Sequence, residues 1–234
     1  MKPPPPTGQE TIRTIRQQSD TILMAFSCGK DSIGAWLACR PHFDRIIPYY
    51  MYLVPDLEFV EESLAYYERW FGCHIMRIPH PSIYRQLNDL VFQPPEHRAI
   101  LDRANFGNLS FLDLQDMIRD QEGIPTEAYV ASGVRAVDSP YRMIAMKTHG
   151  PISRKQRQFF PIWDWNKARL VSELQSAGVK LPVDYQIFGR SFDGIDYRFL
   201  APLKKHFPRD YARILEYFPL ADLEIFKHEA RSKT

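Results

Sequence analysis

The sequence predicts an α/β protein with a doubly wound, mostly parallel sheet, a helical insertion and C-terminal helices. Three observations favour this fold. Short apolar runs alternate with segments whose apolar residues recur at helical spacing. A loop of the kind that grips phosphate follows the first run. The chain has 234 residues, 44% of them hydrophobic, which is enough to bury a core. Strands and helices in this order imply right-handed crossovers and a ligand site at the carboxyl ends of the strands.

The first half of the chain supplies the first three strands. Residues 21–26 form a continuous apolar run, typical of a strand buried on both faces, and a helix is expected from about Ser32. A second strand is expected over 45–54, where Pro48 favours an edge or an irregular start. A helix over 56–71 and a third strand over 74–78 follow.

The second half adds a fourth strand and several helices. The strand is expected over 127–131, after an insertion over 93–126 that we interpret as helical, either a lid or an acceptor-binding element. Residues 147–158 are polar and basic, which favours a solvated loop, with a phosphate-binding flap as the alternative. A helix is expected over 167–177, and one or two amphipathic helices over 197–226.

The ends and the domain count complete this outline. Residues 1–20 begin with a proline-rich stretch that has no apolar core of a signal peptide, so we expect a flexible segment. Residues 21–234 are expected to form one domain.

The most informative segment is Ser27-Cys28-Gly29-Lys30-Asp31-Ser32, between the first strand and the first helix. The N-H groups at a helix start have no partner inside the helix, and the helix dipole is positive there, so a phosphate is a natural ligand. Gly29 permits a close approach of the backbone, Lys30 adds a cation, and the two serines offer hydroxyl donors.

Asp31 is the unusual member of this loop, because a carboxylate repels phosphate unless it caps the helix or holds Mg²⁺. Both roles stay open. The loop is not a Walker A loop, since Met24 stands where that loop needs glycine and Asp31 where it needs serine or threonine. The dinucleotide-binding glycine pattern also fails, because only Gly29 and Gly34 lie in the region.

A second candidate motif follows the fourth strand. Gly133 allows the chain to turn at the carboxyl end of that strand, and Arg135 and Arg142 offer planar guanidinium groups that suit phosphate or sulfate. The alternative is that Arg135 and Asp138 form a purely structural ion pair.

These segments resemble a known family. The first is similar to the PP-loop of the adenine nucleotide alpha hydrolase-like superfamily, Ser-Gly-Gly-x-Asp-Ser, with Cys28 in place of the first glycine. Residues 133–142 resemble the Gly-x-Arg-x-x-(Glu/Asp)-Ser-x-x-Arg segment of the phosphoadenosine phosphosulfate (PAPS) reductase family within it, and 161–165 its Pro-Ile-x-Asp-Trp segment.

The resemblance implies a nucleotide site and assigns roles to its residues. Lys30, Asp31 and Arg135 are the expected catalytic residues, and Asp31 and Asp138 the expected Mg²⁺ ligands. The expected nucleotide-binding residues are Ser27, Cys28, Gly29, Lys30, Asp31, Ser32, Gly133, Arg135, Asp138 and Arg142.

The chain has motifs that resemble the family, but it lacks the cysteine that the family's reductase reaction is expected to use. A PAPS reductase is expected to carry a nucleophilic cysteine near its C-terminus, but this chain has only Cys28, Cys39 and Cys73. We therefore favour an ATP pyrophosphatase that adenylates an unknown acceptor and releases pyrophosphate. A PAPS reductase or sulfur-transfer enzyme that uses an external thiol donor protein, or Cys28 itself, is the first alternative. A nucleotide-binding subunit without turnover is the second.

The remaining expectations concern cofactors and partners. The cofactor is expected to be Mg²⁺ with ATP or another adenine nucleotide, with no iron–sulfur cluster and no zinc, because cysteine pairs and histidines at metal-ligand spacing are missing. The net charge of +2 indicates no nucleic-acid patch, and no apolar run approaches the ~20 residues of a membrane helix. We expect a cytoplasmic protein, with room for a homodimer.

Overall fold

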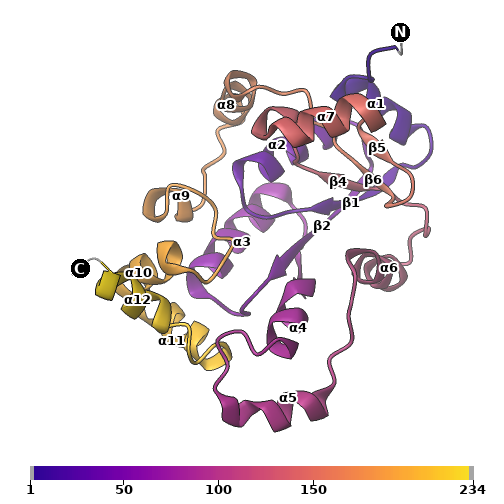
Figure 1. Cartoon of the computed structure of the whole chain (residues 1–234). Helices are drawn as coiled ribbons and strands as arrows, with labels where there is room; N and C mark the ends of the chain where they lie inside the picture. The colour runs from indigo at the N-terminus through magenta and orange to yellow at the C-terminus, as the bar shows by residue number, and fades with distance from the viewer. Residues whose placement is uncertain (1–2, 232–234) are drawn as a thin grey trace. The chain divides into compact units, whose positions relative to one another are not determined.

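The computed structural model describes residues 3–231 (Figure 1). These residues group into two compact units. The first unit contains residues up to 50, 72–76 and 112–181, and the second contains 51–71, 77–111 and the residues from 182 onward. The expectation of one domain over 21–234 stays a prediction.

The strands form a six-stranded sheet. Its strands, in spatial order, are β3 (Met76–Pro79), β2 (Arg45–Tyr52), β1 (Thr21–Ala25), β4 (Val130–Ser132), β6 (Gln158–Phe159) and β5 (Ile152–Ser153). β1 runs parallel to β2 and to β4, β4 runs parallel to β6, and β5 is antiparallel to β6. The predicted doubly wound, mostly parallel α/β sheet is therefore confirmed.

The strand order reverses at β1, which determines where a ligand can bind. The chain passes from β1 through α2 (Lys30–Cys39) to β2 on one side, and it later returns to place β4 on the other side. In open parallel sheets the crevice outside the carboxyl ends of two such strands is the usual ligand site. The two predicted motifs follow β1 and β4, so both lie at this switch point.

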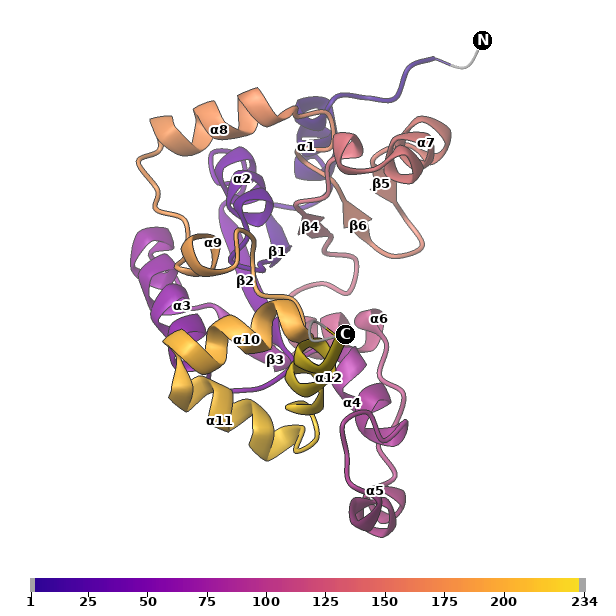
Figure 2. The same cartoon turned by 60° about the vertical axis from the view of Figure 1, so that its left-hand side comes forward.

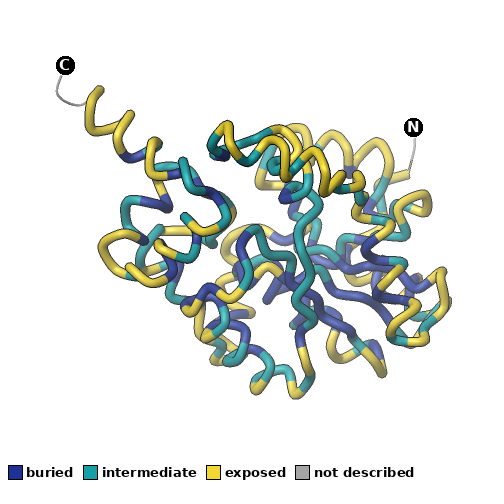
Figure 3. Tube along the Cα trace, turned by 90° about the horizontal axis from the view of Figure 1, so that it is seen from below, coloured by how far each residue is buried: buried dark blue, intermediate teal, exposed yellow. Residues whose placement is uncertain are grey.

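The helices of the first unit cover its strands. They are α1 (Gly8–Arg16), α2, α6 (Phe111–Glu122), α7 (Pro140–His149) and α8 (Lys167–Ser176), with the short 3₁₀ helix η2 (Ala136–Asp138). Ile22, Leu23 and Met24 of β1 have no exposed surface, as expected for a central strand. α2 approaches α8 closely because Gly34 has no side chain: a Cβ there would lie 2.5 Å from Leu170. Figure 3 shows how buried and exposed residues alternate along the chain.

The N-terminal expectation is wrong for residues 8–16, which form helix α1 instead of a flexible segment. The side chain of Thr7 accepts a hydrogen bond from the backbone N-H of Glu10, and the Glu10 carboxylate accepts one from Thr7, so a capping box begins the helix. Ile12 and Ile15 are buried. The Thr-x-x-Glu spacing was visible in the sequence and would have predicted this helix.

The second unit is mostly helical. Its elements include α3 (Glu58–Phe71), α4 (Pro81–Asn88), η1 (Pro95–His97), α5 (Arg98–Ala104), α9 (Asp184–Ile187), α10 (Tyr197–His206), α11 (Pro208–Tyr217) and α12 (Leu223–Arg231). The ring of Phe59 lies 5.1 Å from that of Phe207 and 5.4 Å from that of Phe192. The carboxylate of Asp210, on α11, accepts hydrogen bonds from the first two N-H groups of α3.

The predicted helical insertion and C-terminal helices are confirmed. The 93–126 segment contains η1, α5 and α6, and the chain from 197 onward forms α10, α11 and α12, of which α10 contacts the other two (Figure 2). The expectation of a solvated loop over 147–158 is wrong. α7 continues to His149, and β5 and β6 form an antiparallel pair at the end of the sheet. Two-residue strands are too short to show a sequence period.

Candidate functional site

The loop after β1 has the geometry of an anion site. β1 ends at Ala25, and α2 begins at Lys30, two residues before the expected start. Gly29 is the N-cap residue, with extended backbone angles and no side-chain cap. No cap side chain therefore competes with a ligand for the N-H groups at the start of this ten-residue helix.

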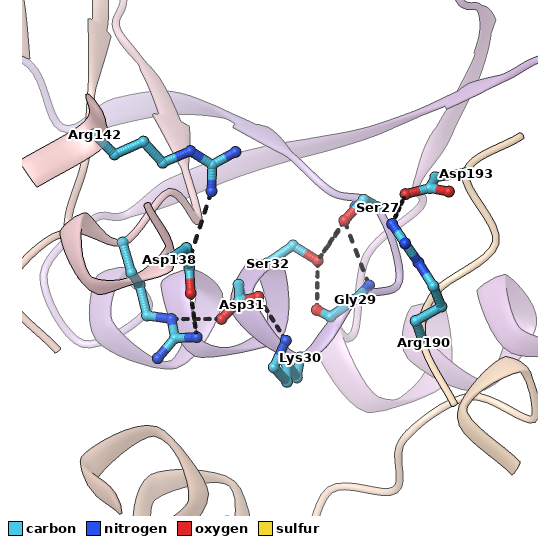
Figure 4. Close-up of polar contacts among 10 residues, drawn as sticks. Ser27, Gly29, Lys30, Asp31, Ser32, Asp138, Arg142, Arg190 and Asp193 are labelled. Carbon is cyan, nitrogen blue, oxygen red and sulfur yellow. Dashed lines mark hydrogen bonds and ion pairs between the residues drawn. The ribbon is translucent and has the colours of Figure 1, made fainter. Parts of the chain in front are cut away.

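A hydroxyl network fixes the shape of this loop (Figure 4). Oγ of Ser32 donates to the carbonyl oxygen of Gly29 at 2.8 Å and accepts from the backbone N-H of Ser27 at 3.2 Å. Gly29 N in turn lies 3.4 Å from Oγ of Ser27. The Ser32 hydroxyl is buried and donates its hydrogen to the Gly29 carbonyl oxygen. In this structure it therefore stabilises the conformation of the loop.

Cys28 adopts a backbone conformation that favours glycine. Its φ is +57°, in the left-handed region, and its side chain is buried. The sequence comparison placed a glycine of the PP-loop pattern at this position, and the backbone explains why glycine suits it.

Four contacts link five charged residues of alternating sign across the two motifs (Figure 4). Lys30 Nζ lies 3.0 Å from Asp31 Oδ2, and Asp31 Oδ1 lies 2.7 Å from Arg135 Nε. Arg135 Nη2 donates to Asp138 Oδ1 at 2.8 Å, and Arg142 Nη1 lies 3.4 Å from Asp138 Oδ2. The structure therefore brings together the five charged residues that the sequence assigned to the site.

Arg135 is the centre of this chain of charges. Its side chain is only 5% exposed, and burial of a guanidinium is unfavourable unless carboxylates compensate its charge. Asp31 and Asp138 provide that compensation from two different elements. Its Nη1 atom is buried and makes no hydrogen bond with the part of the chain that the structure describes. A buried donor without a partner is unusual and needs an explanation, of which a bound ligand is one.

Gly133 brings the two loops into contact. A Cβ atom at this position would lie 2.5 Å from the backbone oxygen of Asp31 and 2.8 Å from the backbone nitrogen of Ser32. Only glycine allows the end of β4 to approach the first turn of α2 this closely. The sequence predicted a turn here, and the structure adds that the glycine is needed for packing.

Two further contacts, which sequence reasoning missed, position the arginines. Ser139 is the N-cap of α7, where its side chain accepts from the backbone N-H of Arg142 at 3.2 Å. The backbone N-H of Ala136 donates to the carbonyl oxygen of Trp163 at 2.8 Å, so the third motif supports the Arg135 loop. The Ser-Pro pair at 139–140 was a helix-start signal that could have revealed the first of these contacts.

The expected metal ligands are engaged by arginines. Asp31 contacts Arg135, and Asp138 contacts both Arg135 and Arg142. Within residues 3–231 the structure shows no group of three or more His, Cys, Asp or Glu side chains arranged to hold a metal. The structure also shows no helix, over the same residues, that is long and apolar enough to span a bilayer.

Comparison with known proteins gives no family. No family model matches the chain, and no curated protein matches it. The U34-tRNA thiolase NcsA from Methanococcus maripaludis is similar to it in structure, with a TM-score of 0.48 and 12% identity over 92% of this chain and 78% of the other.

Two more solved structures are similar. An NH₃-dependent NAD synthetase from Campylobacter jejuni has a TM-score of 0.45 and 13% identity, over 97% of this chain and 95% of that one. A predicted subunit of tRNA methyltransferase from Methanocaldococcus jannaschii has a TM-score of 0.36 and 16% identity, over 82% and 92%. At these values the likenesses do not establish a family for this chain.

The cofactor expectation requires a correction. We expected Mg²⁺ with an adenine nucleotide and no iron–sulfur cluster, whereas the similar thiolase structure contains a [4Fe-4S] cluster. The expectation was wrong because it rested on the absence of cysteine pairs in the sequence, and ligands of a cluster can converge from distant segments. The cysteines of this chain are Cys28 and Cys39, both buried, and Cys73, which is half-buried.

Proposed function

We propose that this chain is a PP-loop protein of the adenine nucleotide alpha hydrolase-like superfamily, and that it binds an adenine nucleotide outside the carboxyl ends of β1 and β4. The observation that supports this proposal best is the ion pair between Asp31 and Arg135 at 2.7 Å. It joins two loops, each of which resembles a nucleotide-binding motif of that superfamily, at the switch point of the sheet.

We further propose that the protein adenylates an acceptor. An acceptor oxygen attacks the α-phosphorus of ATP, the bond from that phosphorus to the bridging oxygen of pyrophosphate breaks, and pyrophosphate leaves. The start of α2 and Lys30 hold the phosphates, while Nη1 of Arg135 donates to the charge that develops. Catalysis of this kind consists mostly of positioning and electrostatic stabilisation, so it requires no cysteine.

Sulfonucleotide chemistry is the second candidate, since Arg135 and Arg142 occupy the arginine positions of the segment that resembles the PAPS reductase family. Cys28 directly precedes Gly29, the N-cap residue of α2, so it is the cysteine that belongs to the proposed site. Its burial, with only 3% of its surface exposed, argues against direct attack on a substrate in this conformation.

The test is calorimetric titration of the protein with ATP and, separately, with PAPS, followed by an assay of pyrophosphate release. Tighter binding of ATP together with pyrophosphate release is the expected result. Preference for PAPS, with activity lost in Cys28→Ser, would support the second candidate instead. Tight binding of ATP without pyrophosphate release for any acceptor would indicate a non-catalytic subunit.

A matched pair of variants tests the site itself. Lys30→Ala removes a cation from the start of α2, and we expect at least a tenfold loss of nucleotide affinity, because a contact between charged groups contributes ~1.5–3 kcal/mol. Lys205→Ala removes an exposed cation from α10 and should leave the affinity unchanged. Equal affinity in both variants would disprove the proposed site.

A further inference from the structure

Helix α7 presents an apolar face to solvent. Tyr141 is 85% exposed and Ile144 62% exposed, and Met146 is the residue of this ten-residue helix that is buried. Residues 141, 144, 145 and 148 share one side of a helix, because spacings of three and four bring side chains together. A soluble helix normally turns its aromatic and branched side chains inward, so this orientation indicates a surface that contacts another molecule.

The stretch of sequence that contains this face is basic. Residues 139–163 contain five Lys or Arg residues and no Asp or Glu, whereas the rest of the chain carries 25 basic and 28 acidic side chains. Lys147 is exposed on α7, and Arg154 and Lys155 are exposed in the turn between β5 and β6. Among residues 3–231 the structure gives none of these three side chains an ion pair, so their charge is available to an anionic partner. Figures 1 and 2 both show α7 beside β5.

This surface adjoins the proposed nucleotide site. α7 begins at Pro140, two residues after Asp138, whose carboxylate holds Arg135. Val137, one residue before that aspartate, is 51% exposed. A molecule bound along α7 would therefore reach the loop that carries the buried arginine. An acceptor substrate has to approach the nucleotide from such a neighbouring surface.

We propose that the acceptor is a single-stranded nucleic acid, which binds to the α7 surface formed by Tyr141, Ile144, Lys147, Arg154 and Lys155. The inference rests on the proposed function, which it deepens by naming the class of acceptor. An exposed tyrosine together with exposed cations that form no ion pair among the described residues is a combination that binds unpaired bases and their phosphates. A duplex offers no unstacked base to Tyr141, so single strands are preferred. A bilayer would require a larger apolar face than two such side chains provide.

The experiment is fluorescence anisotropy with labelled 20-nucleotide single strands of RNA and DNA, a duplex, and anionic phosphatidylserine vesicles as a separate arm. We expect micromolar binding of a single strand at low salt, weaker binding of the duplex, and an affinity that falls steeply with salt. Comparison of the affinities for the RNA and DNA strands shows which sugar the protein prefers. Binding to vesicles without binding to a single strand would overturn the proposal in favour of a membrane surface.

Substitutions in the α7 surface test whether the single strand binds there. Tyr141→Ala should lower affinity roughly 5- to 150-fold through the loss of stacking. The triple variant Lys147→Ala, Arg154→Ala and Lys155→Ala should reduce the slope of log affinity against log salt by about 2 to 3. Both variants should retain the nucleotide affinity of the wild type, which also shows that they fold.

A control with the same charge change excludes a general effect of net charge. The variant Lys205→Ala, Arg209→Ala and Lys227→Ala removes three exposed cations from the second unit, and it should bind single strands as the wild type does. An equal loss in this control would disprove the α7 surface. ATP binding without binding of any single strand would disprove this inference and leave the nucleotide site standing, whereas strand binding without ATP binding would disprove the proposed function.

Discussion

Nε of Arg135 lies 2.7 Å from Oδ1 of Asp31, and this contact joins the loop after β4 to the first turn of α2. The two residues are more than one hundred positions apart in the sequence. Asp31 also contacts Lys30, so one carboxylate contacts two of the cations that the proposed function assigns to phosphate. A nucleotide that binds to Lys30 has to compete with Asp31 for it, while Asp138 still holds Arg135 in place.

The first prediction concerns Asp31→Asn. This substitution leaves the buried guanidinium of Arg135 with one carboxylate instead of two, and we expect a loss of about 1–3 kcal/mol in the free energy of unfolding. Asp44→Asn is the control, because its ion pair with Arg16 is exposed and should contribute less than about 1 kcal/mol. Urea unfolding followed by circular dichroism measures both. Equal losses would show that Asp31 does not stabilise Arg135.

The second prediction concerns Gly133→Ala. The added methyl group would lie 2.5 Å from the backbone oxygen of Asp31, and backbone atoms cannot move aside cheaply. We expect a destabilisation of at least about 1 kcal/mol, together with weaker nucleotide binding, because the two loops have to separate. At Gly107 an added methyl group meets nothing within 4 Å, so Gly107→Ala should leave stability unchanged or raise it by up to about 1 kcal/mol. Tolerance of alanine at Gly133 would contradict this packing.

The sequence was sufficient for the parts of the site that local pattern determines. An apolar run, a glycine-containing loop and a helical period follow one another within 21–39, and each is a short-range signal. The glycine and arginines after β4 were also visible as a motif. The pairing of Asp31 with Arg135 was not, because it depends on which strands are neighbours, and topology is a property of the whole chain.

Other differences have local physical causes. α1 was missed because the proline-rich start outweighed a Thr-x-x-Glu capping box at 7–10. β4 begins at Val130 instead of 127, and strand ends are where pattern is weakest. No helix was expected over 140–149, so the sequence did not indicate which way the side chain of Tyr141 faces.

The third prediction is a pH dependence of stability that arises from Asp184. Its side chain is buried, Oδ2 accepts from the backbone N-H of Phe192 at 3.0 Å, and Oδ1 makes no hydrogen bond with the described residues. Burial raises the pKa of this carboxyl, and the Phe192 hydrogen bond opposes the shift. The folded state therefore holds the proton more tightly than the unfolded state, so the contribution of Asp184 to stability declines as pH rises above 3.8, its ordinary pKa.

Asp184→Asn removes this titration and keeps an acceptor for the Phe192 N-H group. We expect the variant to gain stability relative to the wild type as pH increases from 4 to 7, measured by urea unfolding at several pH values. Asp193→Asn is the control, since that carboxylate is exposed and pairs with Arg190. A stability difference that stays constant across this pH range would show that Asp184 has the same pKa in the folded and unfolded states, which would contradict the prediction.

The fourth prediction concerns the backbone of Cys28, which has a φ of +57°. Left-handed angles cost a residue with a side chain roughly 1–2 kcal/mol, so Cys28→Gly relieves strain that offsets the loss of a small buried thiol. We expect its stability to lie within about 1 kcal/mol of the wild type, with nucleotide affinity retained. Cys28→Val places a β-branched side chain at the same angle and should be clearly less stable than Cys28→Gly. Urea unfolding and calorimetric titration of the two variants measure both properties, and equal stability of glycine and valine would mean that the loop does not adopt this conformation in solution.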